Sequence, residues 1–478
     1  MQLSQRIDMT KDNKIRVRFA PSPTGVLHIG SARTTLFNYL FAKKNKGSFI
    51  LRIEDTDKKR SKKEFEKDIM ENLEWLGLKW DELYKQSQRI KIYEKYLKKL
   101  LDSGKAYKKE IIWFKNPNKK VLFDDLIRGR VEVDSSLLGD FSLAKDLKTP
   151  LYNFAAVVDD YEMKISQVIR GEDHISNTPK QILIYEALGW KPPQFAHLPL
   201  ILGPDRSKLS KRHGAVSISE YREQGYLPEA LINFMALLGW SPQGGSASGG
   251  NPRDEEILSM DQLIQKFSLD KIQKGGAIFN IEKLDWFNGY YIRKIPLDKL
   301  IELCIPFLIE CGLIKPNFKM EQEPPAYGGY FLKQKYTIAK TKKEISVDKL
   351  KKIIALEQKR MKKLSEVGEL TEFFFKEPIY KADLLKWKNM TKKEIIKSLD
   401  KSYSMLGTFK DREFGREKIK EILMPEAEKF NKDKGYLFWP LRVALSGRDK
   451  SPSPFEIGEI MGKEKVLKRI KQAQKLLK

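Results

Sequence analysis

Residues 14–53 most constrain the fold, because they read as a strand, a turn, a helix and a second strand in succession. Apolar and basic residues alternate over 14–19, which is the period of a strand. Residues 21–25 are turn formers, helical spacing runs from Ser31, a candidate N-cap, to about Lys44, and 48–53 is a short apolar run. A strand–helix–strand unit of this length predicts a parallel sheet.

Residues 105–150 interrupt this pattern. They contain short apolar pieces separated by turn residues, which indicates an insertion built of hairpins. Apolar spacing on either side predicts a sheet that continues past the insertion, with helices over 65–76, 90–101 and 179–188 and strands over 165–169 and 195–202.

The later part of the chain differs in composition. Residues 241–252 are a Gly/Ser-rich loop, and 321–330, with two prolines and two glycines, are the best candidate for a linker. Beyond it, 331–478 is almost wholly helical in pattern and rich in lysine. All four histidines fall in the first 213 residues, so this last segment is expected to be a recognition or scaffold domain and not a second acid–base site.

The chain is strongly basic. Ninety Lys and Arg residues against 64 Asp and Glu give a formal charge of +26. Such an excess favours an anionic partner, either nucleic acid or anionic lipid. Lysine spread over solvated surfaces would give the same balance, so charge alone leaves both interpretations open.

Several protein classes are excluded by composition. No stretch approaches the roughly 18 apolar residues of a membrane span, and residues 1–14 lack the apolar core of a secretory signal. Cys304 and Cys311 are too few for a disulfide framework or a four-cysteine zinc site, and both are expected to be buried thiols. We therefore expect a cytoplasmic protein with no membrane partner.

Two short segments carry residues suited to phosphate chemistry. Residues 21–31 join the first strand to the first helix, where helix N–H groups and a partial positive charge favour a phosphate. Gly30 there lets a purine approach the backbone, and His28 can donate to phosphate oxygens. Residues 205–214 place four cations and two serines between a proline and a glycine, which suits a triphosphate. Each segment alone also fits an ordinary turn.

Together the two segments resemble the signatures of a known enzyme family. His28-Ile-Gly-Ser31 resembles the HIGH element of class I aminoacyl-tRNA synthetases, and Lys208-Leu-Ser-Lys-Arg212 resembles their KMSKS loop. Further segments are similar to the glutamyl branch, the last two to its bacterial members: 19–25, 52–57, 152–155, 168–174, 440–447 and 455–468. The resemblance covers nearly the whole chain.

This resemblance implies an α/β Rossmann-type catalytic domain with an inserted α+β subdomain, followed by helical stem-contact and all-α anticodon-binding domains. The implied boundaries are 1–104 and 151–215 for the two halves of the catalytic domain, 105–150 for the inserted subdomain that binds the acceptor end, 216–330 for the stem-contact region and 331–478 for the all-helical anticodon-binding domain.

The resemblance also implies an activity. It is the ATP-dependent attachment of L-glutamate to the 3′ end of tRNA-Glu through an enzyme-bound glutamyl-adenylate, carried out by a monomer with Mg²⁺ arriving on the ATP. No covalent enzyme intermediate forms in this reaction. The protein therefore has to position the reactants and stabilise a pentavalent phosphorus, and it needs no nucleophile of its own.

The site residues are carried over by the same resemblance. The implied catalytic residues are His28, Lys208 and Lys211. The implied ATP-binding residues are Thr24, Gly25, His28, Gly30, Ser210 and Lys211. The implied glutamate-binding residues are Arg18, Ser22, Glu54, Tyr152 and Arg170, because the fork of an arginine matches a carboxylate with two hydrogen bonds. Without the resemblance, Arg18 would be interpreted as a solvent-facing strand residue and Glu54 as part of an acidic cap.

The sequence departs from the family pattern at two places. The fourth HIGH position is Ser31, and the glutamyl branch commonly has a small residue there. Many relatives carry a zinc-binding cysteine cluster where this chain has Lys108 to Lys120 without a cysteine, so we expect no structural zinc and no other metal site.

Three other functions fit parts of the sequence. A glutaminyl-tRNA synthetase resembles the catalytic half but usually ends in β-barrels, and a shorter relative that modifies a tRNA base would lack the last third. A catalytically silent tRNA-binding protein is disfavoured by the intact His28, Lys208 and Lys211. Whether tRNA-Gln is also charged is left open by the sequence.

Overall fold

The computed structural model describes residues 14–242, 254–317, 331–429 and 433–477. It divides the chain into two compact units, Met1–Asn288 and Gly289–Lys478, so the division falls inside the predicted stem-contact region. The candidate linker at 321–330 and most of the Gly/Ser-rich loop at 241–252 lie outside the described residues. The domain boundaries implied by the sequence stay predictions.

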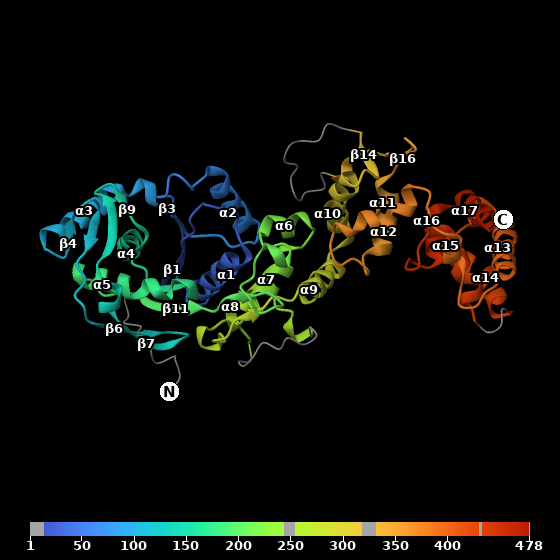
Figure 1. Cartoon of the computed structure of the whole chain (residues 1–478). Coiled ribbons are helices and arrows are strands. Elements are labelled where there is room, and N and C mark those ends of the chain that lie inside the picture. The colour runs from blue at the N-terminus through green and yellow to red at the C-terminus, as the bar shows by residue number, and fades with distance from the viewer. Residues whose placement is uncertain (1–13, 243–253, 318–330, 430–432, 478) are drawn as a thin grey trace. The chain divides into compact units, whose positions relative to one another are not determined.

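A parallel sheet forms the centre of the first unit (Figure 1). Strand β1 pairs in parallel with β2 and β2 with β3, while β10 pairs in parallel with β11. The two groups meet at the start of β1, where Ser166 N donates to Arg16 O at 2.9 Å. The strand order is therefore β3-β2-β1-β10-β11. The bounds are β1 Arg16–Phe19, β2 Ser48–Ile53, β3 Glu82–Lys85, β10 Gln167–Gly171 and β11 Gln194–Leu198.

Four of the helices that connect these strands lie where the periodicity predicts, one of them with a shifted start, and a fifth over 152–162 was not predicted. The first helix begins at Ile29, and its N-cap is His28 instead of the expected Ser31, because the His28 ring accepts from Gly30 N. Here an imidazole nitrogen accepts the capping hydrogen bond that a Ser or Asp oxygen usually accepts. The helices are α1 Ile29–Lys44, α2 Lys63–Trp75, α3 Ile90–Asp102, α4 Tyr152–Glu162 and α5 Thr178–Leu188.

The single strand predicted over residues 195–202 is divided in two. Pro199 separates β11 from β12 (Ile201–Leu202), because proline has no N–H for a sheet ladder. Strand β12 then pairs in parallel with β13 (Ala277–Ile278), a partner far along the chain. This break turns the chain away from the sheet and toward the segment that contains Lys208.

The insertion over 106–150 contains strands and a 3-10 turn, η3 (Ser135–Leu138), and no α-helix. The helices that pack against it, α3, α4 and α5, all lie outside it in the sequence (Figure 1). Its Phe141 and Leu143 lie in one buried cluster with Leu97 of α3, so the insertion shares a core with the catalytic domain. The strands are β4 Ala106–Lys108, β5 Ile112–Phe114, β6 Lys120–Asp125, β7 Gly129–Asp134, β8 Phe141–Asp146 and β9 Thr149–Pro150.

The hairpin of β6 and β7 adds directly to the catalytic sheet. Strand β6 runs parallel to β11, with Asp125 opposite Phe195, and antiparallel to β7. The insertion thus reaches the strand next to β10. The first unit is completed by α6 Ile218–Glu223, α7 Pro228–Ala236, α8 Met260–Lys266 and the start of α9 Ile281–Lys294.

Where the structure describes it, the second unit is helical apart from one small antiparallel sheet. The sequence pattern did not predict the strands over 336–338 and 344–345. Both are short, lie in a lysine-rich stretch and have one buried residue each, Tyr336 and Ile345. The strands are β14 Ile314–Pro316, β15 Tyr336–Ile338 and β16 Glu344–Ile345. The helices are α10 Leu297–Glu310, α11 Val347–Glu357, α12 Glu366–Phe375, α13 Lys392–Gly407, α14 Arg416–Lys429, α15 Gly435–Ser446, α16 Pro454–Met461 and α17 Lys463–Leu476.

Two expectations about individual residues had different outcomes. Cys304 is buried as predicted, whereas Cys311 is exposed at the end of α10, so the prediction of two buried thiols was wrong for the second.

Among the described residues, no helix has both the length and the apolar character needed to cross a membrane.

Glu357, the last residue of α11, is a buried carboxylate with little compensation. Its Oε2 accepts from Arg360 Nη1 at 3.0 Å, while Oε1 has no partner among the described residues. Burial raises the pKa of Glu357 to about 7, against the opposing effect of Arg360. The pKa of Glu357 is therefore higher in the folded chain than in the unfolded chain. The resulting stability of the fold is fully present at a pH below the ordinary carboxyl pKa, where Glu357 is protonated in both states. It is lost as the pH rises through about 7, because Glu357 then ionises in its buried position.

Glu357→Gln removes this ionisation. Between about pH 5 and about pH 8 the variant should gain about 1–3 kcal/mol in free energy of unfolding relative to the wild type. Urea titrations with pulsed hydrogen-exchange labelling of α11 and α12 measure the change locally. Glu369→Gln, at an exposed carboxylate on α12, is the matched control. A difference between wild type and Glu357→Gln that does not vary with pH would contradict the raised pKa.

Candidate active site

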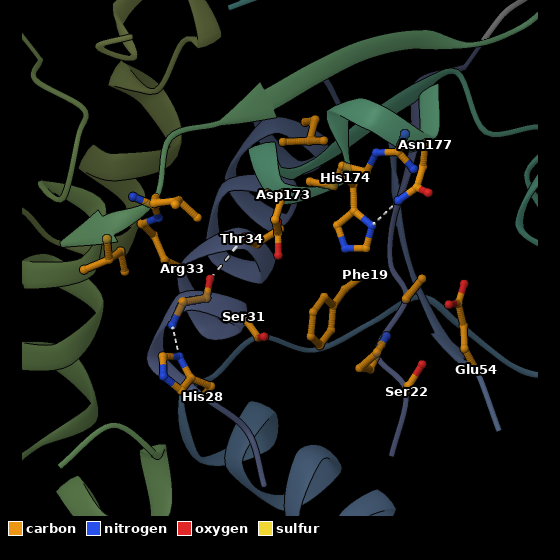
Figure 2. A pocket seen from close by; sticks show the side chains of 18 of the residues that line it. Phe19, Ser22, His28, Ser31, Arg33, Thr34, Glu54, Asp173, His174 and Asn177 are labelled. Atoms are coloured by element: carbon orange, nitrogen blue, oxygen red, sulfur yellow. Dashed lines mark hydrogen bonds between the residues drawn. The ribbon is translucent and has the colours of Figure 1, made fainter. Parts of the chain in front are cut away.

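A cavity of about 670 Å³ lies where the ends of β1 and β10 diverge (Figure 2). The chain leaves β1 toward β2 on one side of the sheet and leaves β10 toward β11 on the other, so this is a topological switch point, where open parallel sheets bind ligands. The volume is sufficient for a nucleotide together with a small second substrate. Eight of the sequence-predicted residues line the cavity: Arg18, Ser22, His28, Gly30, Glu54, Tyr152, Arg170 and Lys208.

Thr24, Gly25 and Ser210 are not among the described residues that line it. Thr24 and Gly25 lie in the turn after β1, where Thr24 N donates to Ser22 O at 2.8 Å. Ser210 lies in the loop beyond Lys208, and its N–H donates to His213 Nδ1 at 3.1 Å. The backbone of Lys211 begins the 3-10 turn η5 (Lys211–His213), and its side chain lies outside the described part of the structure.

His28 is held in one tautomer by its capping role. Its Nδ1 accepts from Gly30 N at 3.0 Å, so the ring proton of the neutral imidazole sits on Nε2 (Figure 2). Burial and the nearby charge of Lys208 lower the pKa of His28, which keeps the ring neutral at physiological pH. His28 therefore offers one Nε2–H donor at the cavity wall, beside the N-terminus of α1.

Backbone pairing brings the two signature segments together. Ile29 N donates to Val216 O at 2.8 Å, and Ile218 N donates to Leu27 O at 2.9 Å, so the chain just after the cationic loop pairs with the residues around His28. The loop is itself tied back to β12, since Leu209 N donates to Ile201 O at 3.0 Å. Lys208 and His28 consequently face one cavity although 180 residues separate them.

Arg18 is buried in an ion-pair network, so its interpretation as a solvent-facing strand residue was wrong. Its Nε donates to Asp160 Oδ1 at 3.1 Å, and the same oxygen accepts from Arg52 Nη1 at 2.6 Å. Arg52 is fully buried and also donates to Glu54 Oε1 at 3.1 Å. Burial alone would raise the pKa of Asp160, but the two guanidinium groups outweigh it and lower that pKa.

Glu54 is buried at the edge of the same network, which does not fit an acidic cap. Burial raises the pKa of Glu54, and the opposing pull of Arg52 and Arg18 only partly offsets the effect. A cationic ligand beside the Glu54 carboxylate would supply the positive charge that Arg52 and Arg18 only partly provide. Glu54 is thus suited to an ammonium group in the cavity.

Sequence reasoning missed Arg52, Asp159 and Asp160 as parts of the site. Asp159 accepts from Gln86, Arg89 and Tyr93 at 2.7–2.9 Å and supports the network from beneath. A signal was present, because two adjacent carboxylates follow the apolar run 154–158 of helix α4 and one arginine stands in the apolar strand β2. Charged residues in such positions are rarely buried unless paired.

Arg170 is held differently from Arg18 and Arg52. Its Nη2 donates to Thr178 Oγ1 at 2.7 Å and its Nε to His197 Nε2 at 3.2 Å, so both partners are neutral groups. Its Nη1 is buried and has no hydrogen-bond partner of good geometry among the described residues, and the neighbouring Tyr152 side chain acts on the guanidinium from the cavity wall. The positive charge of Arg170 is therefore not neutralised by a direct ion pair, and Nη1 is free to bind an anion in the cavity.

Tyr152 and His174 form the wall next to Arg170. The Tyr152 hydroxyl lies 3.1 Å from His174 Nδ1, and Asn177 Nδ2 lies 3.5 Å from the same nitrogen. Burial, and then the charge of Arg170, lower the pKa of His174 to about 4. His174 is neutral at physiological pH and shapes the pocket without adding a cation.

Among the described residues, no group of three or more His, Cys, Asp or Glu side chains is arranged to hold a metal ion. The expected absence of a structural zinc in the insertion stays a prediction.

Comparison with known proteins assigns this site to a class of nucleotide-dependent enzymes. The family described as "tRNA synthetases class I (E and Q), catalytic domain" matches residues 14–111 and 108–286, and an "Anticodon binding domain" matches residues 299–474. The chain belongs to the class I tRNA synthetases of the glutamate and glutamine (E and Q) type, which confirms the resemblance seen in the sequence.

Named relatives are more specific. Glutamate–tRNA ligase 1 of Caldanaerobacter subterraneus subsp. tengcongensis is 40% identical, covering 97% of this chain and 98% of the relative. Glutamate–tRNA ligase 1 of Caldicellulosiruptor saccharolyticus is 42% identical, covering 96% and 98%. The crystal structure of a glutamate tRNA ligase from Elizabethkingia meningosepticum in complex with its amino acid has a TM-score of 0.77 and 33% identity, covering 97% of this chain and 100% of that one.

Asp160→Asn tests the buried network without a change in shape. The substitution leaves Arg18 and Arg52 without their shared charged partner, and we expect the free energy of unfolding of the first unit to fall by about 3–5 kcal/mol. Urea denaturation measures the loss. Asp102→Asn, at an exposed carboxylate at the end of α3, should stay within about 0.5 kcal/mol of the wild type. Equal effects of the two variants would contradict a central role for Asp160.

Proposed function

We propose that this chain attaches L-glutamate to the 3′ end of tRNA-Glu, using ATP and passing through an enzyme-bound glutamyl-adenylate. The observation that carries the proposal is a single cavity with two different ends. His28 and Glu54 lie apart in it (Figure 2); Lys208 acts electrostatically on His28 at the start of α1, and Arg18 acts on both Glu54 and Arg170. The names of the relatives at about 40% identity support the same reaction.

ATP is proposed to occupy the end of the cavity beside α1. The Nε2–H of His28 and the ammonium group of Lys208 would donate to phosphate oxygens, and Gly30 leaves room for the adenosine. Thr24, Gly25, Ser210 and Lys211 are proposed as further ATP-binding residues on their family positions, Lys211 as a catalytic residue as well. Mg²⁺ is proposed to arrive bound to the triphosphate.

Glutamate is proposed to occupy the other end. Its two carboxylates match two of the cavity-lining arginines, Arg18 and Arg170, and its ammonium group matches Glu54. Ser22 and Tyr152 line the same end and are proposed to fix the backbone and the side chain of the substrate. A carboxamide in place of the side-chain carboxylate would leave one guanidinium without an anion.

The reaction needs positioning and charge stabilisation. A carboxylate oxygen of glutamate attacks the α-phosphorus of ATP, pyrophosphate leaves, and a ribose hydroxyl of the tRNA then displaces AMP. Each step develops negative charge on phosphate or carbonyl oxygens. Fixed donors such as His28 and the loop lysines would stabilise that charge in the transition state.

The rest of the chain is proposed to bind tRNA. The insertion at 105–150 would contact the acceptor end, 216–330 the stem, and the helical region at 331–478 the anticodon. The helical character of the described part of this last region disfavours a glutaminyl-type enzyme that ends in β-barrels. We propose a cytoplasmic monomer, in keeping with a role in protein synthesis.

The activity is tested by charging purified tRNA-Glu and tRNA-Gln side by side with radiolabelled glutamate and ATP. We expect glutamyl-tRNA-Glu to form. A product with tRNA-Gln as well would mark a non-discriminating enzyme, and none would mark a discriminating one. Absence of product with either tRNA, in a preparation that binds tRNA, would favour a catalytically silent tRNA-binding protein.

Lys211→Ala tests the role of the cationic loop. Its charge is proposed to act on the triphosphate in the transition state, so ATP–pyrophosphate exchange with glutamate and tRNA present should slow at least about 100-fold. Binding of tRNA, measured by filter retention, should change less than about threefold. Equal losses in exchange and in tRNA binding would contradict the assignment.

A further inference from the structure

Arg170 is supported from behind by a hydrogen-bonded chain that leads into the insertion. Its Nε donates to His197 Nε2 at 3.2 Å, and His197 Nδ1 lies 2.6 Å from Asp125 Oδ2. His197 and Asp125 are both buried, His197 completely. Neither residue is among those that line the 670 Å³ cavity, and Arg170 is the lining residue to which His197 is hydrogen-bonded.

The donors around His197 fix its tautomer. Arg170 Nε can only donate, so His197 Nε2 must accept, and the ring proton has to sit on Nδ1. The Thr178 hydroxyl lies 3.0 Å from the same Nε2; it accepts from Arg170 Nη2 at 2.7 Å and donates to His174 O at 3.5 Å. The Asp125 carboxylate accepts the Nδ1 proton and so selects the one tautomer that can hold Arg170.

Asp125 is itself fixed. Its Oδ1 accepts from Ile127 N at 2.9 Å and Arg128 N at 2.8 Å, and its Oδ2 accepts from His197 N at 3.1 Å. The parallel pairing of β6 with β11 places Asp125 opposite Phe195, two residues before His197. A residue of the insertion is thereby locked against the strand next to β10.

A neutral imidazole is well suited to this position. A carboxylate in contact with Arg170 would also orient the guanidinium, but it would neutralise the charge that a ligand anion needs. The imidazole accepts a hydrogen bond without a negative charge, and the carboxylate that sets its tautomer stands one ring farther away. Arg170 is thus oriented while its charge stays available to the cavity.

We propose that Asp125 and His197 are positioning residues for Arg170 and so determine the affinity of the enzyme for its amino acid. The inference rests on the proposed function, in which Arg170 Nη1 binds a carboxylate of glutamate. It assigns a role in substrate binding to Asp125, a residue of the insertion otherwise proposed to contact only the acceptor end of tRNA.

Asp125→Asn is the main test. The amide oxygen can keep the two backbone bonds of Oδ1, which places the amide NH₂ against His197 Nδ1 and forces the ring proton onto Nε2, facing Arg170. In ATP–pyrophosphate exchange with saturating tRNA-Glu, KM for glutamate should rise at least about tenfold, while KM for ATP stays within about twofold. Asp124→Asn, the exposed neighbour on β6, is the matched control and should leave both values unchanged.

His197→Gln and His197→Leu form a second test that does not depend on the stability of the first variant. The Gln amide oxygen can accept from Arg170 Nε, whereas Leu cannot, so we expect KM for glutamate to rise at most about threefold in His197→Gln and at least about tenfold in His197→Leu. In the His197→Gln background, Asp125→Asn should add less than it does alone, because its effect passes through the ring.

The outcomes separate the two proposals. A wild-type enzyme without glutamate-dependent exchange overturns the proposed function. If the wild type is active, three results overturn the positioning role: an unchanged KM for glutamate in Asp125→Asn, equal rises in both KM values, or equal KM values in His197→Gln and His197→Leu. A merely structural role for the pair predicts the second of these results.

Discussion

The site depends on one contact between strands that are far apart in the sequence. Ser166, just before β10, bonds to Arg16 of β1 through both its backbone N–H and its hydroxyl oxygen. The two strands lie side by side where they begin and carry the chain in opposite directions where they end. That divergence opens the cavity and places Arg18 and Arg170, each near the end of its strand, on its walls. A different strand order would leave the two arginines on separate surfaces.

Placing several charges in a sheet of this kind is costly, and the structure offsets the cost in two ways. Arg18 and Arg52 share Asp160, so the charges compensate one another inside the protein. Within the described part of the chain, the hydrogen-bond partners of Arg170 are neutral, and the nearest carboxylate in its chain of contacts is that of Asp125, beyond the His197 ring. The network of Arg18, Arg52 and Asp160 stabilises the residues beneath the cavity. The neutral contacts of Arg170 leave its positive charge available to bind an anion.

The end of the cavity beside α1 is built by backbone pairing. Leu27 and Ile29 exchange hydrogen bonds with Ile218 and Val216, and this small ladder fixes the cationic loop next to the start of α1. The same region gives His28 its cap contact, which selects the Nε2–H tautomer. In both His28 and His197, a neighbouring group fixes where the ring proton lies. Gly30 N leaves the proton of His28 on Nε2, where it can be donated, and Asp125 holds the proton of His197 on Nδ1, so that its Nε2 can accept.

The sequence by itself determined the local elements and the identity of the chemistry. Alternation and helical spacing located β1, β2 and α1–α3 to within a few residues, and the two signature segments indicated a class I synthetase, because these features depend on neighbours a few positions apart. Only the tertiary structure decided that Arg18 is buried, that Pro199 breaks the predicted strand, and that Arg52, Asp159, Asp160, Asp125 and His197 belong to the surroundings of the site. Apart from the break at Pro199, which is local, each of these depends on partners tens to more than a hundred residues away. The burial of a charge is set by whether such a partner is present, which periodicity along the chain does not encode.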